Sequence, residues 1–132
     1  MKRIQMKMKN GDCGICCFAM VADITYEDAW EFFRTKVWEK DKDRKVPLVW
    51  KYEMEKALNL SGLEYYKKSS NEDFKTLKGR MALCHPRAPG FFRHWVIYLP
   101  DEGYVVDPEP KQEDKVTEFS RYKALRKYFA II

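Results

Sequence analysis

The sequence predicts an α+β fold in which N-terminal helices pack against a C-terminal antiparallel β-sheet. In the first half of the chain, apolar residues recur at three- and four-residue spacing, which is typical of helices with a buried face. In the second half, short β-branched and aromatic runs are bounded by Pro, Gly and Asp, which is typical of strands joined by turns. A chain of 132 residues with 45% hydrophobic content is long enough to build one core. We therefore expect a single domain over residues 1–132.

The first helix is expected to begin at Cys13. Asn10-Gly11 interrupts the alternating pattern of the N-terminal residues, and Asp12 is a favoured N-cap residue. The residues expected on one face of this helix are Cys13, Cys16, Cys17 and Met20. Free cysteine is among the most buried residue types, so Cys16 and Cys17 are expected to face the core.

Two further helices are expected before residue 63. Thr25-Tyr26-Glu27-Asp28 is similar to a capping box with Asp in place of Glu, and it begins the second helix. The apolar stripe of this helix consists of Ala29, Trp30, Phe33 and Val37. Pro47 suits the first position of the third helix, which is expected to end near Ser61-Gly62. The apolar positions of the third helix are Trp50, Met54, Ala57 and Leu58.

Four strands are expected, over residues 63–66, 81–84, 94–99 and 104–107. Asp101-Glu102-Gly103 is a tight connection between the last two, which predicts a hairpin. His94 begins one arm of this hairpin and Asp107 ends the other, so the two residues must lie side by side. The tail from Ser120 carries apolar residues at helical spacing before a terminal apolar run, and it is expected to be a helix that continues into a strand.

The charge pattern bears on the partners of the protein. The net charge is +5, but through residues 39–45 Lys and Arg are interleaved with Asp and Glu, as on a solvated surface loop. Only the first ten residues are basic without any acid, and no base-reading motif accompanies them, so nucleic acid is not the expected partner. No apolar run is long enough to span a bilayer or to form a signal peptide, so no membrane segment is expected.

Cysteine use indicates the compartment. The four cysteines of the chain are Cys13, Cys16, Cys17 and Cys84. Three of them lie within five residues, too close to pair with one another without strain. We therefore expect reduced thiols and a cytoplasmic protein. Cys84 is expected in the core of a strand, and His85, which follows it at the start of a loop, is expected to have a structural or surface role.

A nucleophile, a base and an orienting acid occur in the order Cys13, His94, Asp107. A thiol reacts as the thiolate, and a helix N-terminus stabilises an anion through its partial positive charge and its backbone N–H groups. An acid opposite His94 accepts a hydrogen bond from one imidazole nitrogen and leaves the other nitrogen to face Cys13. The helices would carry the nucleophile and the sheet the base, with the substrate in the cleft between them.

These residues resemble a known family. Residues 12–20, Asp-Cys-Gly-Ile-Cys-Cys-Phe-Ala-Met, are similar to the pattern Asp/Glu-Cys-Gly-x-Ala-Cys-Leu-Ala-Met of papain-like cysteine peptidases that process bacteriocin leader peptides after a double glycine. His94-Trp95-Val96-Ile97 and Asp107-Pro108 match the family's His-aromatic run and its Asp-Pro. The resemblance implies a papain-like fold, a peptide or protein substrate and no cofactor. It also implies Cys13 as nucleophile, His94 as general base and acid, and Asp107 as the residue that orients His94.

The sequence departs from this family in two respects. A glutamine six residues before the family's cysteine gives a side-chain amide to the oxyanion hole, but Lys7 stands at that position. A two-residue insertion around Asn10-Gly11 would bring Gln5 into its place, and Asn10 is an alternative donor. Family members are usually N-terminal domains of export ABC transporters, whereas this chain is expected to act as a standalone domain. The double-glycine substrate is therefore not implied, and the scissile bond is a peptide bond or another amide.

Three other functions would use the same residues. Cys13-Gly14-Ile15-Cys16 is a C-x-x-C sequence, as in thioredoxin-like redox sites, although the strand–helix alternation of that fold does not follow. The ligands of a zinc site would be Cys13, Cys16 or Cys17, Cys84 and His85. This spacing is poor for metal binding. An inactive relative would hold a peptide in the cleft without cleaving it, and the presence of both the base and its acid speaks against this alternative.

Overall fold

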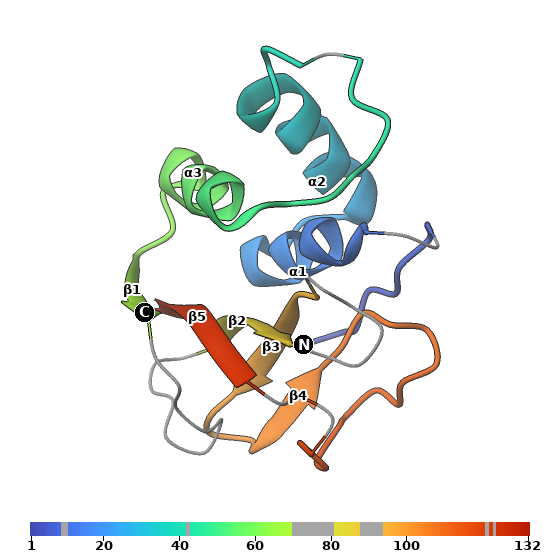
Figure 1. Cartoon of the computed structure of the whole chain (residues 1–132), viewed down its shortest axis with the longest axis vertical. Helices are drawn as coiled ribbons and strands as arrows, with labels where there is room; N and C mark the ends of the chain where they lie inside the picture. Colours follow the sequence, from blue (N-terminus) through green and yellow to red (C-terminus); the bar gives the residue numbers. More distant parts are fainter. Residues whose placement is uncertain (9–10, 42, 70–80, 88–93, 121, 123) are drawn as a thin grey trace.

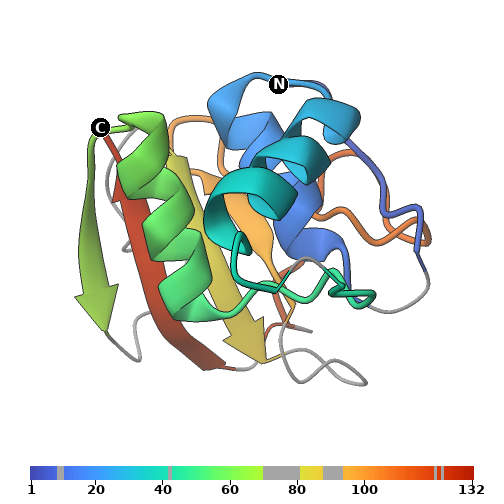
Figure 2. The same ribbon diagram turned by 90° about the horizontal axis from the view of Figure 1, so that it is seen from above.

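The computed structural model describes residues 1–8, 11–41, 43–69, 81–87, 94–120, 122 and 124–132. The helical elements in these ranges are α1 (Cys13–Ala22), α2 (Tyr26–Phe32), the π-helical turn η1 (Phe33–Val37) and α3 (Lys51–Ser61). The strands are β1 (Tyr65–Ser69), β2 (Met81–Arg87), β3 (Val96–Leu99), β4 (Tyr104–Val106) and β5 (Ala124–Ile131). All three α-helices lie on the same side of the sheet (Figures 1 and 2).

The strands form one antiparallel sheet in the order β1-β5-β2-β3-β4. The predicted α+β class, with helices packed on a C-terminal antiparallel sheet, is confirmed. β3 and β4 form the predicted hairpin, in which Ile97 lies opposite Val106 and Leu99 opposite Tyr104. Gly103 has a positive φ of 75° in the connection, a conformation that favours glycine. Because β4 is the last strand in the order, the hairpin lies at one edge of the sheet. His94 precedes β3 and Asp107 follows β4, so both residues lie at the same end of the antiparallel hairpin.

Side chains alternate between two core clusters on the two faces of the sheet. Leu83, Ile97 and Phe129 belong to the cluster shared with the helices. The residues of the second cluster are Ala82, Val96, Tyr98, Val105, Val116, Tyr122 and Ala130. Val116 pairs with Val105 through backbone hydrogen bonds of 2.8 and 2.9 Å, so the segment after β4 folds back against the hairpin and contributes to this second cluster.

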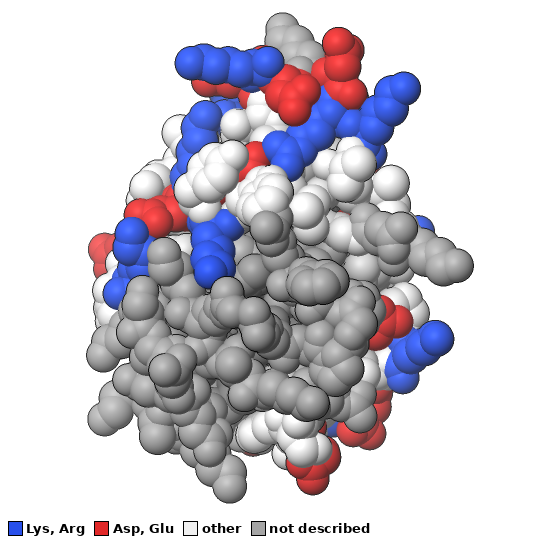
Figure 3. All heavy atoms as spheres, viewed as in Figure 1, with Lys and Arg blue, Asp and Glu red and all other residues white. Residues whose placement is uncertain are grey.

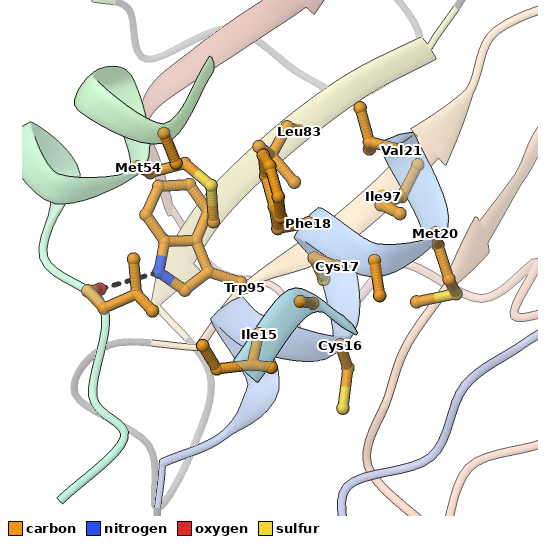
Figure 4. Packing of buried hydrophobic residues seen from close by; sticks show 14 of the residues in the cluster. Ile15, Cys16, Cys17, Phe18, Met20, Val21, Met54, Leu83, Trp95 and Ile97 are labelled. Atoms are coloured by element: carbon orange, nitrogen blue, oxygen red, sulfur yellow. Dashed lines mark hydrogen bonds between the residues drawn. The ribbon is translucent and has the colours of Figure 1, made fainter. Parts of the chain in front are cut away.

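Helix α1 is buried along nearly its whole length. Every residue from 13 to 21 is buried, since the sheet packs on one side of this helix while α2 and α3 pack on others. Figure 4 shows Ile15, Cys16, Cys17 and Phe18 within this core. The predicted core positions of Cys16 and Cys17 are confirmed. We expected one buried face for this helix, whereas residues on all of its faces are buried.

The second helix begins as predicted, and the third begins later. The Thr25 hydroxyl accepts the backbone N–H of Asp28 at 3.0 Å, and the helix continues through η1 to Val37. The prediction that α3 starts at Pro47 is wrong, because the helix begins at Lys51. Arg44 donates to the carbonyl of Leu48 at 2.8 Å and contacts Glu53 in α3, which holds this segment as an extended lead-in to the helix. The predicted end at Gly62, with φ of 77°, is confirmed.

Two strand predictions need correction. β2 continues to Arg87 through a register shift between Cys84 and Pro86, so His85 lies within a strand and not at the start of a loop. The helix expected from Ser120 is wrong, because the described tail forms β5, which pairs with both β1 and β2. A central strand satisfies its backbone groups on both edges, and this outweighs the helical spacing of a few apolar side chains. Residues 121 and 123 lie outside the described residues.

Charges of both signs are mixed on the surface, as the interleaved charges of residues 39–45 led us to expect. Figure 3 shows Lys and Arg side chains interleaved with Asp and Glu over the helical part of the molecule. Lys67 pairs with Glu55 at 3.1 Å, and Lys7 pairs with Glu27 at 2.9 Å. None of the described helices is long and apolar enough to cross a membrane.

Candidate active site

Cys13 is the first residue of α1 and follows a buried carboxylate. Asp12 occupies the N-cap position, but its side chain does not cap the helix. Its Oδ2 atom accepts the backbone N–H groups of Lys7 at 2.9 Å and Met8 at 3.2 Å, and the Tyr26 hydroxyl at 2.9 Å. The predicted N-cap position is thus correct, but the carboxylate ties the N-terminal segment and α2 to the beginning of α1.

Gly14 allows an unusually close approach at the start of this helix. A Cβ atom on Gly14 would lie 2.6 Å from Cβ of Val49 and 3.0 Å from Cδ1 of Trp95. The Trp95 indole donates to the carbonyl of Val49 at 2.9 Å (Figure 4). The backbone N–H of Trp95 points at Sγ of Cys13 at 3.4 Å. Glycine therefore brings the residues just before β3 into contact with the thiol.

The predicted hairpin brings His94 and Asp107 together. Nε2 of His94 and Oδ1 of Asp107 are 2.6 Å apart. Oδ1 also accepts the backbone N–H of Glu109 at 2.9 Å, and Oδ2 accepts the hydroxyl of Tyr122. Cys13, His94 and Asp107 are exposed by only 2%, 1% and 2%, so the three predicted residues share a buried environment.

The electrostatics of the site favour a protonated imidazole. Burial by itself lowers the pKa of His94, but hydrogen bonds with Asp107 and Cys13 and the negative charges of both outweigh burial and raise it to about 10. Burial by itself raises the pKa of Asp107, but the hydrogen bond and charge of His94, followed by the Tyr122 hydroxyl and the Glu109 N–H, lower it overall. Since Nε2 is engaged with Asp107, Nδ1 is the ring nitrogen that is left for Cys13.

The predicted oxyanion-hole residue occupies a different environment. The side chain of Gln5 is exposed, whereas Cys13 is buried. Lys7, at the position of the family's glutamine, pairs with Glu27 at 2.9 Å, and its Nζ lies 4.7 Å from the ring centroid of Tyr26. Asn10 lies outside the described residues. Gln5 therefore stays a prediction from the sequence.

Three residues of the site were missed by the sequence analysis. Arg3 donates from Nη1 to the backbone carbonyls of Asp107 and Glu109, both at 3.0 Å, and thereby holds the turn after β4. Tyr122 holds the carboxylate of Asp107, and Val49 packs on Gly14. The basic, acid-free N-terminus was the only signal for Arg3. Tyr122 and Val49 carried no signal beyond being apolar or aromatic.

The metal alternative finds no support in the described part of the chain. There, no three side chains of His, Cys, Asp or Glu are grouped so that they could hold a metal ion. The side chains of Cys84 and His85, which the zinc alternative requires, lie outside the described residues.

Two solved structures are similar to this chain over nearly its whole length. The first is the peptidase domain of Streptococcus ComA, a bifunctional ABC transporter involved in a quorum-sensing pathway, with a TM-score of 0.70, 12% identity, and coverage of 98% of this chain and 96% of that one. The second is a double-glycine-motif protease from an AMS/PCAT transporter in complex with the leader peptide, with a TM-score of 0.64, 20% identity, and coverage of 99% and 91%. This chain has the fold of these peptidase domains.

The peptidase-domain fold confirms the architecture that the sequence resemblance implied. No family model matches the sequence, and no curated protein sequence matches it. At 12% and 20% identity, the likeness concerns the fold alone. Within this peptidase-domain fold, α1 presents Cys13 to the residues before β3, and the β3–β4 hairpin presents His94 backed by Asp107.

Proposed function

We propose that this protein is a cysteine peptidase that hydrolyses a peptide or related amide bond through Cys13, His94 and Asp107. The observation that carries the proposal is the buried 2.6 Å contact between Nε2 of His94 and Oδ1 of Asp107, with Cys13 close enough to His94 to contribute to its raised pKa. A base that contacts both a nucleophile and an orienting acid is the arrangement of acyl-transfer enzymes. The peptidase-domain fold supports the same reaction class.

The first step is formation of the thiolate. His94 takes the proton of Cys13, and Asp107 stabilises the resulting imidazolium, in keeping with the raised pKa of His94. The backbone N–H of Trp95 donates to the sulfur, and the first turn of α1 adds its partial positive charge. The site thereby prepares an ion pair inside a buried environment, where each of these interactions is stronger than in water.

The thiolate then attacks the carbonyl carbon of the substrate. The oxyanion is held by backbone N–H groups at the start of α1, and Gln5 is the predicted side-chain donor. His94 donates its proton to the leaving amine, and a thioester between Cys13 and the acyl group remains. His94 next takes a proton from water, the hydroxide attacks the thioester, and the acid product leaves with Cys13 restored.

A peptide is the proposed substrate class. One similar structure holds a leader peptide, and this supports a peptide-binding cleft in the shared fold. A leader peptide with a double glycine is the first substrate to assay, with other amides after it. Cys13, Cys16 and Cys17 are too close in the sequence to pair with one another without strain, which supports the proposed cytoplasmic location.

The surroundings of Cys16 favour the peptidase over a redox pair with Cys13. Cys16 is fully buried, and burial, followed by the charges of Asp12 and Cys13, raises the pKa of its thiol. A thiol that stays protonated is a poor partner in thiol–disulfide exchange. Cys16→Ser is therefore expected to keep peptidase activity, whereas a redox protein would lose dithiol–disulfide activity with this substitution.

The experiment that tests the proposed function is covalent trapping with a peptidyl vinyl sulfone, followed by mass spectrometry. We expect one label, on Cys13, in the wild type and in Cys16→Ser. Cys13→Ala should keep its fold, take up no label and lose all turnover of a peptide that the wild type cleaves. Labelling at Cys16 instead, full activity of Cys13→Ala, or peptide binding by the wild type without any cleavage would contradict the proposal.

Gln5→Ala tests the oxyanion-hole prediction separately. Loss of a side-chain donor to an oxyanion lowers kcat on the order of 10²–10³-fold. A residue that stays in solvent would leave kcat nearly unchanged, and the donors would then be the backbone N–H groups at the start of α1. Lys7→Ala is the matched control, because it removes a nearby exposed side chain that is engaged with Glu27.

A further inference from the structure

Tyr122 joins the second core cluster to the active site. It comes 15 residues after Asp107 in the sequence, and its side chain is only 7% exposed. Its ring belongs to the cluster with Val96, Tyr98 and Val105, apart from the cluster that contains Cys13. Its hydroxyl donates to the carboxylate of Asp107, the residue that follows β4. The cluster on the far side of the sheet thus makes a polar contact with a proposed catalytic residue.

The hydrogen bonds of Asp107 are divided between its two oxygens. Oδ1 receives His94 and the backbone N–H of Glu109, while Oδ2 receives Tyr122. A carboxylate held at one oxygen rotates about its Cβ–Cγ bond, and a donor on the other oxygen fixes the plane of the group. In a buried site, removal of such a donor also leaves a charged oxygen unsatisfied.

We propose that Tyr122 is a positioning residue that holds the carboxylate of Asp107 in the orientation that orders His94. This inference rests on the proposed peptidase function, because it assigns Tyr122 a role through the Asp107–His94 pair. The second core cluster then serves catalysis as well as stability, since it fixes the ring of Tyr122. The hydroxyl of Tyr122 holds the carboxylate of Asp107, and its ring packs in the second core cluster.

The groups that face Asp107 show what the Tyr122 hydroxyl contributes to holding its carboxylate. His94 faces the carboxylate from the residue pair before β3, and Tyr122 faces it from the segment after Val116. The guanidinium of Arg3 binds the backbone carbonyl of Asp107 and pairs through Nε with Asp114 at 2.9 Å. Tyr122 is therefore the side chain outside the proposed triad that contacts the carboxylate within the described residues, and its hydrogen bond helps lower the pKa of Asp107 after the larger effects of burial and His94.

Tyr122→Phe separates the two roles, because it removes the hydroxyl and keeps the ring. The readout is the pH profile of iodoacetamide alkylation at Cys13, followed by mass spectrometry, which needs no substrate. Without the hydroxyl, Asp107 takes up a proton at higher pH and ceases to stabilise the imidazolium. We expect the acid limb of the profile to move upward by about 0.5–1 pH unit and kcat/KM to fall about 5–10-fold, with KM nearly constant.

Tyr98→Phe is the matched control, since Tyr98 is a buried tyrosine of the same cluster. It should leave both the pH profile and kcat/KM at wild-type values. His94→Ala is the reference for the proposed function. An unchanged alkylation profile in His94→Ala would overturn the ion pair and with it the peptidase mechanism. If the alkylation profile shifts in His94→Ala but keeps its wild-type form in Tyr122→Phe, the proposed role of Tyr122 is wrong and the peptidase mechanism stands.

A double-mutant cycle covers the case in which Tyr122→Phe alters folding. If Tyr122 acts through Asp107, the Tyr122→Phe change should have no further effect on the alkylation profile in an Asp107→Asn background. Equal effects of Tyr122→Phe in both backgrounds would show that the tyrosine acts through the fold, and the inference would be wrong.

Discussion

The start of α1 and the end of the β3–β4 hairpin meet at the same site but are held by different forces. Cys13 is fixed by close packing, since Gly14 leaves no room for a Cβ atom between Val49 and Trp95. The pair of His94 and Asp107 is fixed by hydrogen bonds from Glu109 and Tyr122 and, through the backbone, from Arg3. The position of Cys13 thus depends on steric fit, and the position of His94 depends on hydrogen-bond donors around Asp107.

This difference predicts two kinds of mutational effect. A change of shape near Cys13 should reduce the free energy of unfolding first, because overpacking strains a whole interface. A change of donor near Asp107 should act on kinetics and pH dependence, because it alters the charge and orientation of a few atoms.

Asp107→Asn should have the largest effect. The amide keeps the size of the carboxylate but removes its charge, so the raised pKa of His94 should fall toward its ordinary value. Loss of a charged hydrogen bond costs about 1.5–3 kcal/mol, which corresponds to a decrease in kcat/KM of about 10- to 150-fold. Steady-state kinetics and thermal unfolding measure the two effects. Asp101→Asn, at an exposed position in the hairpin connection, is the control and should retain wild-type kinetics.

Gly14→Ala should act mainly on stability. The added methyl would lie 2.6 Å from Cβ of Val49, so the helix or the 44–50 segment must move. We expect a loss of about 1–3 kcal/mol in the free energy of unfolding, measured by urea denaturation. Val49→Ala should recover part of this loss in the double variant. If Gly14→Ala leaves stability unchanged and removes only activity, the contrast between shape and donors fails.

The protonation of His94 predicts a pH dependence of stability. The native state holds this proton up to a pKa of about 10, whereas the ordinary pKa of a histidine side chain is 6.5. In the wild type this proton is the one that Cys13 gives up, so the native and unfolded states bind the same number of protons between pH 6.5 and 8. In Cys13→Ala, where Asp107 still raises the pKa of His94, the native state binds more protons, so stability is complete below pH 6.5 and falls as the pH rises. Between pH 6.5 and 8 we expect a decrease on the order of 1 kcal/mol in Cys13→Ala and a nearly flat profile in the wild type. Urea denaturation of the double variant Cys13→Ala/His94→Gln should lack the slope; an equal slope in Cys13→Ala and in the double variant would rule out His94 as its source.

Lys7→Ala should have the smallest effect. The Lys7–Glu27 pair is exposed at the surface, with side-chain exposures of 58% and 71%, and such pairs contribute little to stability. We expect a change below about 1 kcal/mol in urea denaturation and unchanged kcat. A large loss of kcat would instead place the Lys7 side chain, at the position of the family's glutamine, in the chemistry.

The parts of the fold that the sequence predicted are those with local signals. The Thr25 cap, the Gly62 end of α3 and the β3–β4 hairpin each depend on residues that are neighbours in the chain. The hairpin also placed His94 beside Asp107, because a tight connection determines which residues face each other. Local patterns therefore carried the main geometry of the site.

The parts that were missed depend on distant contacts. Pro47 suits a helix start, but Arg44 holds the following residues in an extended segment. The tail has helical spacing, but its place between β1 and β2 makes it a strand. Arg3 is separated by 104 residues from the carbonyl that it binds, and no pattern in the sequence marks such a partner.

The N-terminal segment also affects how the protein should be prepared. The backbone N–H of Met6 donates to the carbonyl of Pro108 at 2.8 Å, next to the two carbonyls that Arg3 binds. Trimming the first two residues leaves these contacts intact, whereas trimming through Met6 removes the support of the turn that carries Asp107. Truncated versions that keep every proposed catalytic residue would then be poor enzymes, and affinity tags are better attached after the exposed Ile132.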